Sequence, residues 1–199
     1  MTDSTAAGFL IPAATPAPLE GQALLDFLQG VIVGITGLDG TLVRPVWQSE
    51  PPNMPDAGTA WCAFRITTRP SDAYPYIKHN ADGDGADALQ RHEELHVLNS
   101  FYDLGSGGQA DGLCAQFRDG LSIAQNREIL TLNNMGFVKA NEPTPVPVIV
   151  KTRWLYRVDL EWILRRQIDR IYPVRTILSA HSTLGTDDGM TRQINVTTD

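Results

Sequence analysis

One string in the sequence has the spacing of a zinc-hydrolase site. The residues His92-Glu93-Glu94-Leu95-His96 match the pattern H-E-x-x-H, in which two histidines one helical turn apart hold the metal and the glutamate activates water. That chemistry requires a helix and a third ligand. If the protein is an enzyme, a zinc-dependent hydrolase that acts through this string is therefore the candidate function.

The segment around this string is predicted to be a strand. From Leu89 to Asp103, apolar residues such as Leu95 and Phe101 alternate with polar neighbours, and the β-branched and aromatic content favours extended backbone. At the usual rise along a strand, His92 and His96 would lie about 13 Å apart, too far to share one ion. The sequence therefore predicts no metal site here.

Two other strings resemble binding motifs but each lacks a required feature. Asp82, Asp84, Asp87 and Glu93 follow part of a calcium-loop spacing, yet the fifth position is Ala86, which has no side-chain oxygen, and the sixth is not the glycine that the bend requires. The glycines at 105 and 107 precede a predicted helix, as in a dinucleotide fingerprint. The segment 122–128 that follows is not the apolar strand which that fingerprint needs.

Nucleophilic chemistry has no support in the sequence either. No serine lies in a G-x-S-x-G elbow, and neither Cys62 nor Cys114 has a nearby histidine in sequence. Two cysteines build neither a disulfide framework nor a zinc site, and both are expected to be buried thiols. We expect a protein that is not an enzyme and that carries no cofactor and no metal.

Composition is that of an ordinary globular protein. The chain is 42% hydrophobic and 20% charged, and its net charge is -7. Its 199 residues are enough to form one well-buried core. The most apolar stretch, Leu24 to Leu38, is interrupted by polar residues and glycines and is too short to span a bilayer. The first residues lack the basic residues with which a secretory signal begins. We expect a soluble protein that does not bind nucleic acid non-specifically.

Periodicity and turn residues predict helices and strands from Leu19 to Ala180. Helices are expected from Leu19 to Gly37, from Ser106 to about Asp119 with Ser106 and Gln109 as a capping box, and over 126–133. Strands are expected over 42–48, 59–68, 89–103, 135–140 and 174–180, and a long polar loop over 70–87. The four tryptophans are expected to pack in the core.

The strongest pattern lies between Trp154 and Leu164. Large apolar residues at every second position alternate with charged ones, which predicts a long two-faced strand that ends at Pro173. From Lys151 to Arg175 the chain carries seven basic residues and three acidic ones. This segment is interpreted either as a solvated strand face or as a basic surface that meets an acidic surface on a neighbouring copy.

The expected fold is α+β. We predict a mixed, mainly antiparallel β-sheet with two main helices packed against it, an extended N-terminal arm and a long loop. The expected divisions are an arm over 1–18, one domain over 19–182 and a frayed polar tail over 183–199. The arm contains three prolines and the apolar residues Phe9-Leu10-Ile11, which we expect to dock on a neighbour or on the chain's own domain.

The order of elements resembles the neck and tail-terminator proteins of tailed bacteriophages. The resemblance covers about residues 19–180. It rests on the helix ending at Gly37-Leu38 and on the segments Leu42–Gln48, Trp61–Phe64, Leu89–Tyr102, Ala124–Glu128 and Arg157–Pro173. None of these is a chemical signature.

The resemblance implies a structural virion protein that is assembled in the host cytoplasm. Members form a ring, expected here to be a homo-hexamer, which caps the tail tube and joins it to the head connector. The implied partners are further copies, the tail tube, the sheath protein and other neck proteins, with DNA only passing through the lumen and no membrane contact. Other neck, adaptor or tail-completion components are the alternative within this class, and a small binding module unconnected with phage is a third possibility.

Within this interpretation, three regions supply the candidate subunit contacts. We expect the basic strand, the arm and the 70–87 loop to reach neighbours. The candidate interface residues are Arg153, Arg157, Arg165, Arg166, Arg170, Phe9, Leu10, Ile11, Tyr74 and Tyr76.

Overall fold

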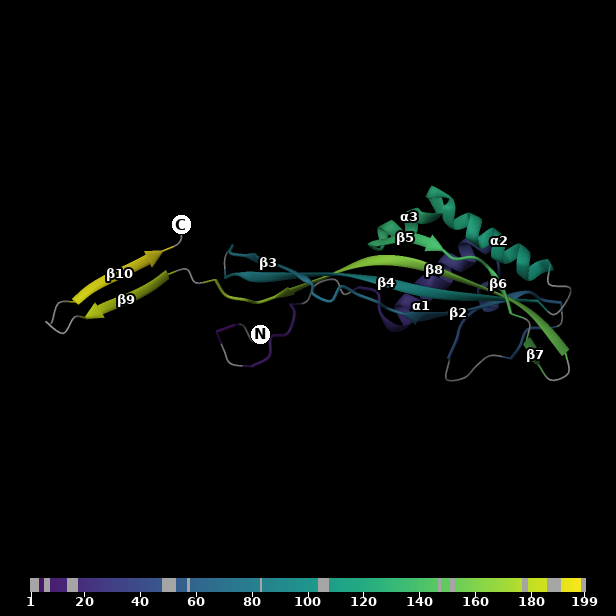
Figure 1. Cartoon of the computed structure of the whole chain (residues 1–199), viewed down its shortest axis with the longest axis horizontal. Coiled ribbons are helices and arrows are strands. Elements are labelled where there is room, and N and C mark those ends of the chain that lie inside the picture. The colour runs from purple at the N-terminus through teal and green to yellow at the C-terminus, as the bar shows by residue number, and fades with distance from the viewer. Residues whose placement is uncertain are drawn as a thin grey trace. The chain divides into compact units, whose positions relative to one another are not determined.

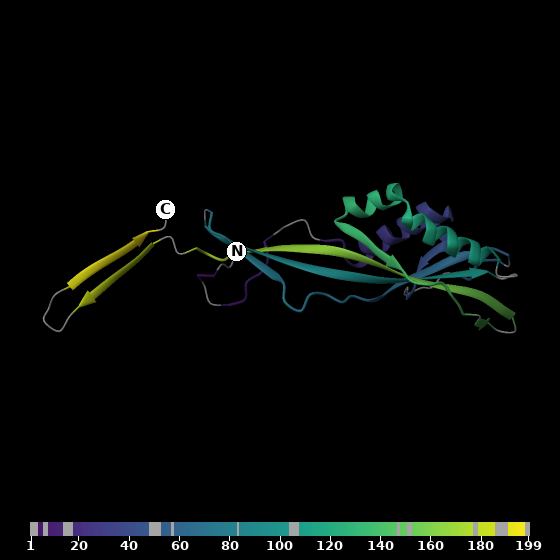
Figure 2. The same cartoon turned by 45° about the horizontal axis from the view of Figure 1, so that its top comes forward.

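A β-sheet with helices packed on one face dominates the computed structural model (Figures 1 and 2). The structure describes residues 4–5, 8–13, 18–47, 53–56, 58–82, 84–103, 108–146, 148–150, 153–176, 179–185 and 191–197. Within these residues, three helices and an eight-stranded, mostly antiparallel sheet confirm the predicted α+β fold. None of the described helices is long and apolar enough to cross a membrane.

The chain divides into two compact units. We call Ala17–Pro75 with Arg91–Ile168 the helical unit, and Met1–Pro16 with Tyr76–Gln90 and Asp169–Asp199 the strand unit. The predicted boundaries at residues 18 and 182 stay predictions.

The sheet of the helical unit has the order β1-β2-β4-β8-β5. These strands are β1 (Val43–Pro45), β2 (Trp61–Thr68), β4 (Ala86–Asp103), β8 (Arg153–Tyr172) and β5 (Met135–Ala140), and β4 and β8 continue into the strand unit. The short strands β6 (Thr144–Pro145) and β7 (Val148–Val150) also pair with β8. β1 and β2 pair in parallel, whereas the pairs β2–β4 and β5–β8 are antiparallel.

The edge strand β5 is irregular. It pairs with β8 from Met135 to Ala140, but the register shifts between Phe137 and Lys139, so one residue bulges out of the ladder. Val138 at the bulge and Lys139 are both exposed. A bulge bends an edge strand and interrupts the row of backbone groups that another strand could use.

Three helices cover one face of this sheet. They are α1 (Gly21–Thr36), α2 (Gly108–Ser122) and α3 (Ala124–Leu132). Leucines and isoleucines at three- and four-residue spacing give α1 its buried side, and Gly37 ends the helix with a positive φ of 71° while its N–H donates to the Val33 carbonyl. The predicted Ser106 cap lies outside the described residues.

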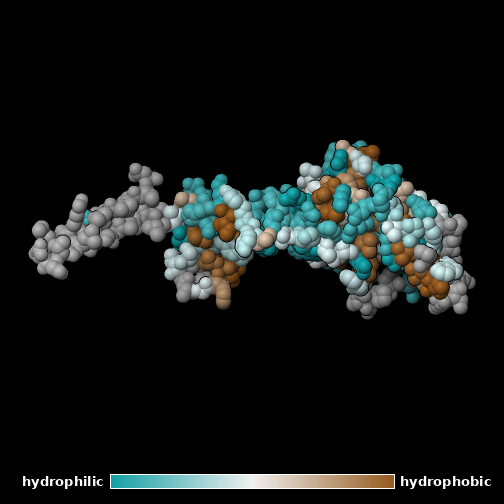
Figure 3. Space-filling view, viewed as in Figure 1, coloured by the Kyte–Doolittle hydropathy of each residue, from teal (hydrophilic) through white to brown (hydrophobic). Residues whose placement is uncertain are grey.

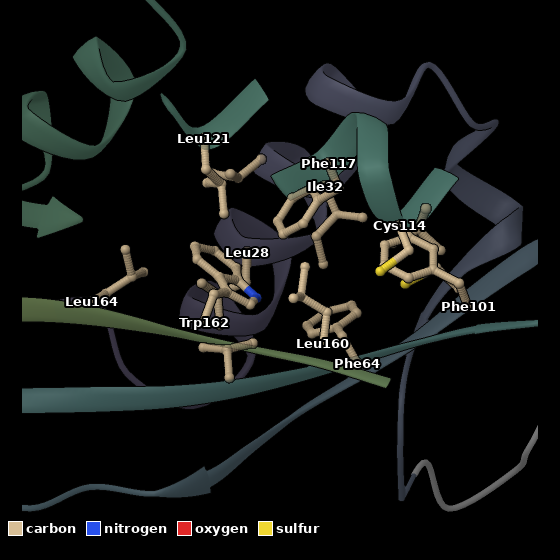
Figure 4. Close-up of a cluster of buried hydrophobic side chains, with 14 of the residues drawn as sticks. Leu28, Ile32, Phe64, Phe101, Cys114, Phe117, Leu121, Leu160, Trp162 and Leu164 are labelled. Atoms are coloured by element: carbon tan, nitrogen blue, oxygen red, sulfur yellow. The ribbon is translucent and has the colours of Figure 1, made fainter. Parts of the chain in front are cut away.

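Aromatic and aliphatic side chains from the three helices and from β1, β2, β4, β5 and β8 form the core, part of which Figure 4 shows. The ring of Phe117 on α2 stands edge-on to Trp162 on β8, with centroids 5.3 Å apart, and its centroid lies 6.1 Å from that of Phe101 on β4. Such edge-to-face contacts add to the burial of the rings themselves. Trp162 is therefore the centre at which α1, α2 and β8 meet the rest of the core.

Only one of the four tryptophans belongs to this core, so the predicted packing of the others is wrong. Trp162 is fully buried, Trp61 stacks on Tyr102 on the opposite face of the sheet, and Trp47 and Trp154 are 77% and 66% exposed. Near Trp154 the alternation changes phase, because Leu155 occupies the buried position there. The predicted strand at 42–48 is also shorter, since a 3-10 turn over Gly40–Leu42 precedes β1.

In the strand unit, two predictions are wrong. Part of the expected 70–87 loop is a strand, β3 (Tyr76–Asn80), which pairs with β4 although all its side chains are exposed and give no apolar alternation. The last strand expected over 174–180 and the frayed tail are replaced by two antiparallel strands, β9 (Ser179–Gly185) and β10 (Thr191–Thr197). Most residues of this hairpin are small or polar, and the two-residue spacing of Ile194 and Val196 is too short a pattern to predict a strand.

Two glycines of α2 provide a stability test. A Cβ on Gly120 would lie 2.3 Å from the Ile35 Cγ2 atom of α1, whereas a Cβ on Gly112 would meet nothing within 4 Å. Overpacking predicts that Gly120→Ala lowers the free energy of unfolding by about 1–3 kcal/mol. The matched variant Gly112→Ala should raise it by up to about 1 kcal/mol, because alanine is the better helix former. Urea unfolding followed by circular dichroism measures both, and equal effects would contradict the close helix contact.

Candidate functional site

The zinc-like string lies on β4, as predicted, and its residues point to opposite sides of the sheet. His92, Glu94 and His96 share one face, while Glu93 shares the other with the buried Leu95. No group of three His, Cys, Asp or Glu side chains among the described residues could hold a metal ion. The arrangement therefore lacks the convergence of ligands and base that zinc hydrolysis requires.

Glu93, the residue that would activate water, is held in an ion cluster with Arg166 of β8. The Arg166 guanidinium donates from Nε and Nη2 to the Glu93 carboxylate at 2.7 and 2.6 Å, and from Nη2 to the Glu20 carboxylate at 2.7 Å. Its Nη1 donates to the Leu19 carbonyl at 2.6 Å, and Arg69 also binds Glu20. The cluster fastens the start of α1 to β4 and β8.

The burial of Arg166 corrects its predicted role. Its side chain is only 2% exposed and its charge is met by carboxylates of the same chain, so it does not lie on an outer basic surface. Its position follows the two-residue period of Trp162 and Leu164, which places it on the helix-covered face. Sequence reasoning could have found this by applying the period of β8 to its charged residues as well.

On the other face, the two histidines bind separate carboxylates. The Asp72 carboxylate accepts the His92 backbone N–H at 3.0 Å, and this hydrogen bond is the main reason why the pKa of Asp72 lies below its ordinary value. The His92 ring lies 3.3 Å from the same carboxylate, whereas the His96 ring lies 3.6 Å from Glu161. With Arg165, several of these residues line a shallow hollow of about 160 Å³. Within it, Asp72 and His92 bind each other.

Part of the basic segment is neutralised within the chain. Arg157 binds Asp159 through two guanidinium nitrogens, which raises the pKa of Arg157, and it lies over the Tyr102 ring. Ser100 donates to the same Asp159 carboxylate at 2.6 Å. In the strand unit, Arg175 pairs with Asp84. For Arg157, the interpretation as part of a solvated strand face is therefore better supported than the interpretation as part of a basic surface that contacts a neighbouring copy.

The other predicted interface residues are mostly at the surface. Arg165 and Arg170 on β8 are exposed, as are the arm and loop side chains apart from the half-buried Leu10. The side chain of Arg153 lies outside the described residues. The most exposed of the apolar set are Phe9 at 95% and Tyr74 at 90%, followed by Ile11 and Tyr76.

The arm is tied to the strand unit by its backbone. The N–H of Ala13 donates to the Ile171 carbonyl at 2.7 Å, and that of Ser4 donates to the Pro173 carbonyl at 3.2 Å. The Ser4 hydroxyl accepts the backbone N–H of Arg175. The arm is therefore held along the end of β8 while Phe9 and Ile11 remain exposed.

The remaining two strings also lack a ligand site among the described residues. In the calcium-like string, the Asp87 carboxylate lies 2.6 Å from the His79 ring and Asp84 pairs with Arg175. The glycines at 105 and 107 lie outside the described residues. The helix α3, not an apolar strand, follows α2, as the sequence indicated.

A first prediction concerns the ion cluster. Replacing Arg166 with methionine removes a fully buried guanidinium and leaves the Glu93 carboxylate, only 12% exposed, without its cation, so the free energy of unfolding should fall by about 3–5 kcal/mol. Arg170→Met on the exposed part of the same strand should change it by less than about 0.5 kcal/mol. Urea denaturation gives both values, and comparable losses would refute the structural role of Arg166.

A second prediction concerns the two thiols, which are both buried. Burial raises the pKa of Cys114 to about 11 and also raises that of Cys62. At about pH 8, roughly one Cys114 in a thousand is then a thiolate, the form that reacts with thiol reagents. Labelling of the native protein should be very slow and should become fast in guanidinium. Rapid labelling of the native protein would mean that a thiol is exposed.

Comparison with known proteins gives the family. The family described as phage neck terminator proteins matches residues 22–188, which include α2, α3, all of α1 except its first residue, and the whole eight-stranded sheet. No curated protein matches the chain. The match covers most of the sequence. The chain belongs to the phage neck terminator protein family, whose role is structural.

Proposed function

We propose that this protein is a subunit of a ring at the phage neck that caps the finished tail tube and joins the tail to the head connector. The family match over residues 22–188 carries this proposal. The ring is a homo-hexamer in our proposal, and its partners are the tail tube, the sheath and the neighbouring neck proteins.

Surface features of the chain support a role in assembly. A subunit that stops a polymer must match the last ring on one side and present a different surface on the other. Exposed aromatic and aliphatic residues project from the arm and from the segment that leads into β3. Apolar side chains that gather at a surface mark sites of contact with other proteins. We propose Phe9, Ile11, Tyr74 and Tyr76, with the exposed Arg165 and Arg170, as contacts with neighbouring subunits or rings.

The charge of the chain suits passage of DNA through the ring. The net charge is -7, and the described cations of β8 include two that are paired with carboxylates, Arg157 and Arg166. A surface of this kind repels phosphates and does not hold the genome during its transit.

Loss of the gene tests the proposal. In a phage that lacks this protein, tube growth has no cap, so electron micrographs should show tails of irregular length that are separated from filled heads. Wild-type protein supplied from a plasmid should restore joined particles with tails of uniform length.

Electron microscopy of the purified protein is a second test of the proposed ring. Negative-stain images should show rings of a single stoichiometry, alone or on isolated tail tubes. Joined particles of normal tail length in the absence of the protein would reject the proposed function.

A further inference from the structure

A short hairpin at the start of β8 presents two large apolar side chains to solvent. β7 pairs with Arg153–Leu155, and in this register Ile149 lies directly opposite Trp154. Directly opposed residues of an antiparallel pair lie on the same face with their side chains in contact distance. Ile149 is 58% exposed and Trp154 is 66% exposed. They form an apolar wedge, which we call the hairpin tip.

A groove of matching character lies elsewhere in the helical unit. Its volume is about 630 Å³, and it runs between α3 and β5. The lining includes Ala124, Leu132, Met135 and Phe137, of which Leu132 is 81% exposed. Arg127 and Glu128 supply its charged rim. The groove is thus mainly apolar and is large enough for aromatic and aliphatic side chains.

The hairpin tip of a chain cannot reach the groove of that same chain. β8 holds both features, since β7 pairs with it at Arg153–Leu155 and β5 pairs with it at Trp162–Arg166. Ten residues separate Trp154 from Leu164, the partner of Phe137, which corresponds to roughly 33 Å along a strand. Figures 1 and 2 show β7 and the α3–β5 pair at separate ends of this unit. Figure 3 shows hydrophobic surface at both places.

We propose that the hairpin tip of one copy occupies the α3–β5 groove of the next copy. This inference rests on the ring of the proposed function and names the contact that closes it. Because tip and groove are different surfaces, the contact is head-to-tail, the type that forms a ring when the rotation between neighbours closes. A buried tryptophan in a partner's pocket is a frequent centre of binding energy.

Charge supports this choice of occupant. In the sequence, Lys151 and Arg153 stand between Ile149 and Trp154, and Glu128 is exposed at the rim of the groove, next to Arg127. Among the described residues, the ion pairs of Arg69, Arg118, Arg157, Arg166 and Arg175 are made with other carboxylates than that of Glu128. Two cations between the tip residues in the sequence and a carboxylate at the groove favour this pairing, in addition to the apolar fit.

Disulfide trapping tests the contact. The double variant Ile149→Cys with Leu132→Cys places one thiol on the tip and one in the groove, while the native Cys62 and Cys114 are buried. Mild oxidation should give a ladder of covalent oligomers beyond the dimer on non-reducing gels, because each copy bonds to two neighbours. Each single variant should stay monomeric on the same gel.

Other outcomes overturn the inference in distinguishable ways. Dimers from Ile149→Cys alone would show that two tips meet each other. Rings in electron micrographs without a ladder would reject this contact and leave the proposed function standing. Absence of rings, alone or on tail tubes, would reject both.

A tryptophan pair gives a measurement that does not depend on trapping. Trp154→Ser should raise the protein concentration needed for ring formation at least about tenfold, because it removes the larger side chain of the tip. Trp47→Ser, at a similarly exposed tryptophan outside the hairpin, should change it less than about twofold, and both variants should unfold at the wild-type urea concentration. Equal weakening by the two substitutions would overturn the assignment of the tip.

Discussion

The alternation of side chains along β8 is the constraint on which the rest of the helical unit depends. This strand neighbours β4 and pairs with β5, β6 and β7, so its two faces decide what lies on each side of the sheet. Val158, Leu160, Trp162 and Leu164 meet the helices on one face. Between them, Asp159 and Glu161 accept hydrogen bonds from hydroxyl, amide and guanidinium groups on the other face, where Ile163 is also buried. A slip of one residue would exchange the two sets and bury the charges.

The same alternation shows how far sequence could predict this fold. The two-residue period identified β8 and β4 because both have one buried and one polar face, and helical spacing identified α1. The sequence did not predict β3, because its side chains are all exposed and give no apolar alternation, or the β9–β10 hairpin, because that segment has few large apolar residues. Trp154 was misplaced because residue type favours the core, whereas its exposure depends on a phase change at Leu155 that only tertiary packing reveals.

For the candidate site, the sequence predicted the strand that carries the two histidines but not the ion cluster beside it. The strand geometry around His92 and His96 already argued against a shared metal, and β4 has that geometry. The prolines of the arm predicted extended backbone and no packed element there, whereas the expected docking of Phe9-Leu10-Ile11 stays a prediction. The burial of Arg166 was missed because a positive charge suggests the surface. Glu93 lies on the same face of β4 as the buried Leu95, and its carboxylate is the partner of Arg166. The groove between α3 and β5 depends on how a helix lies against a strand, which spacing alone does not give.

The bulge in β5 has a consequence for how copies of this chain meet. A regular edge strand accepts a strand from any passing molecule, and repeated addition of this kind leads to fibrils with no fixed size. The register shift at Val138 and the exposed Lys139 interrupt that backbone template on the outer edge of the sheet. Association at this side of the unit must then proceed through side-chain fit, which tolerates few orientations. A bent edge strand thus favours assemblies that are finite over aggregates that keep growing.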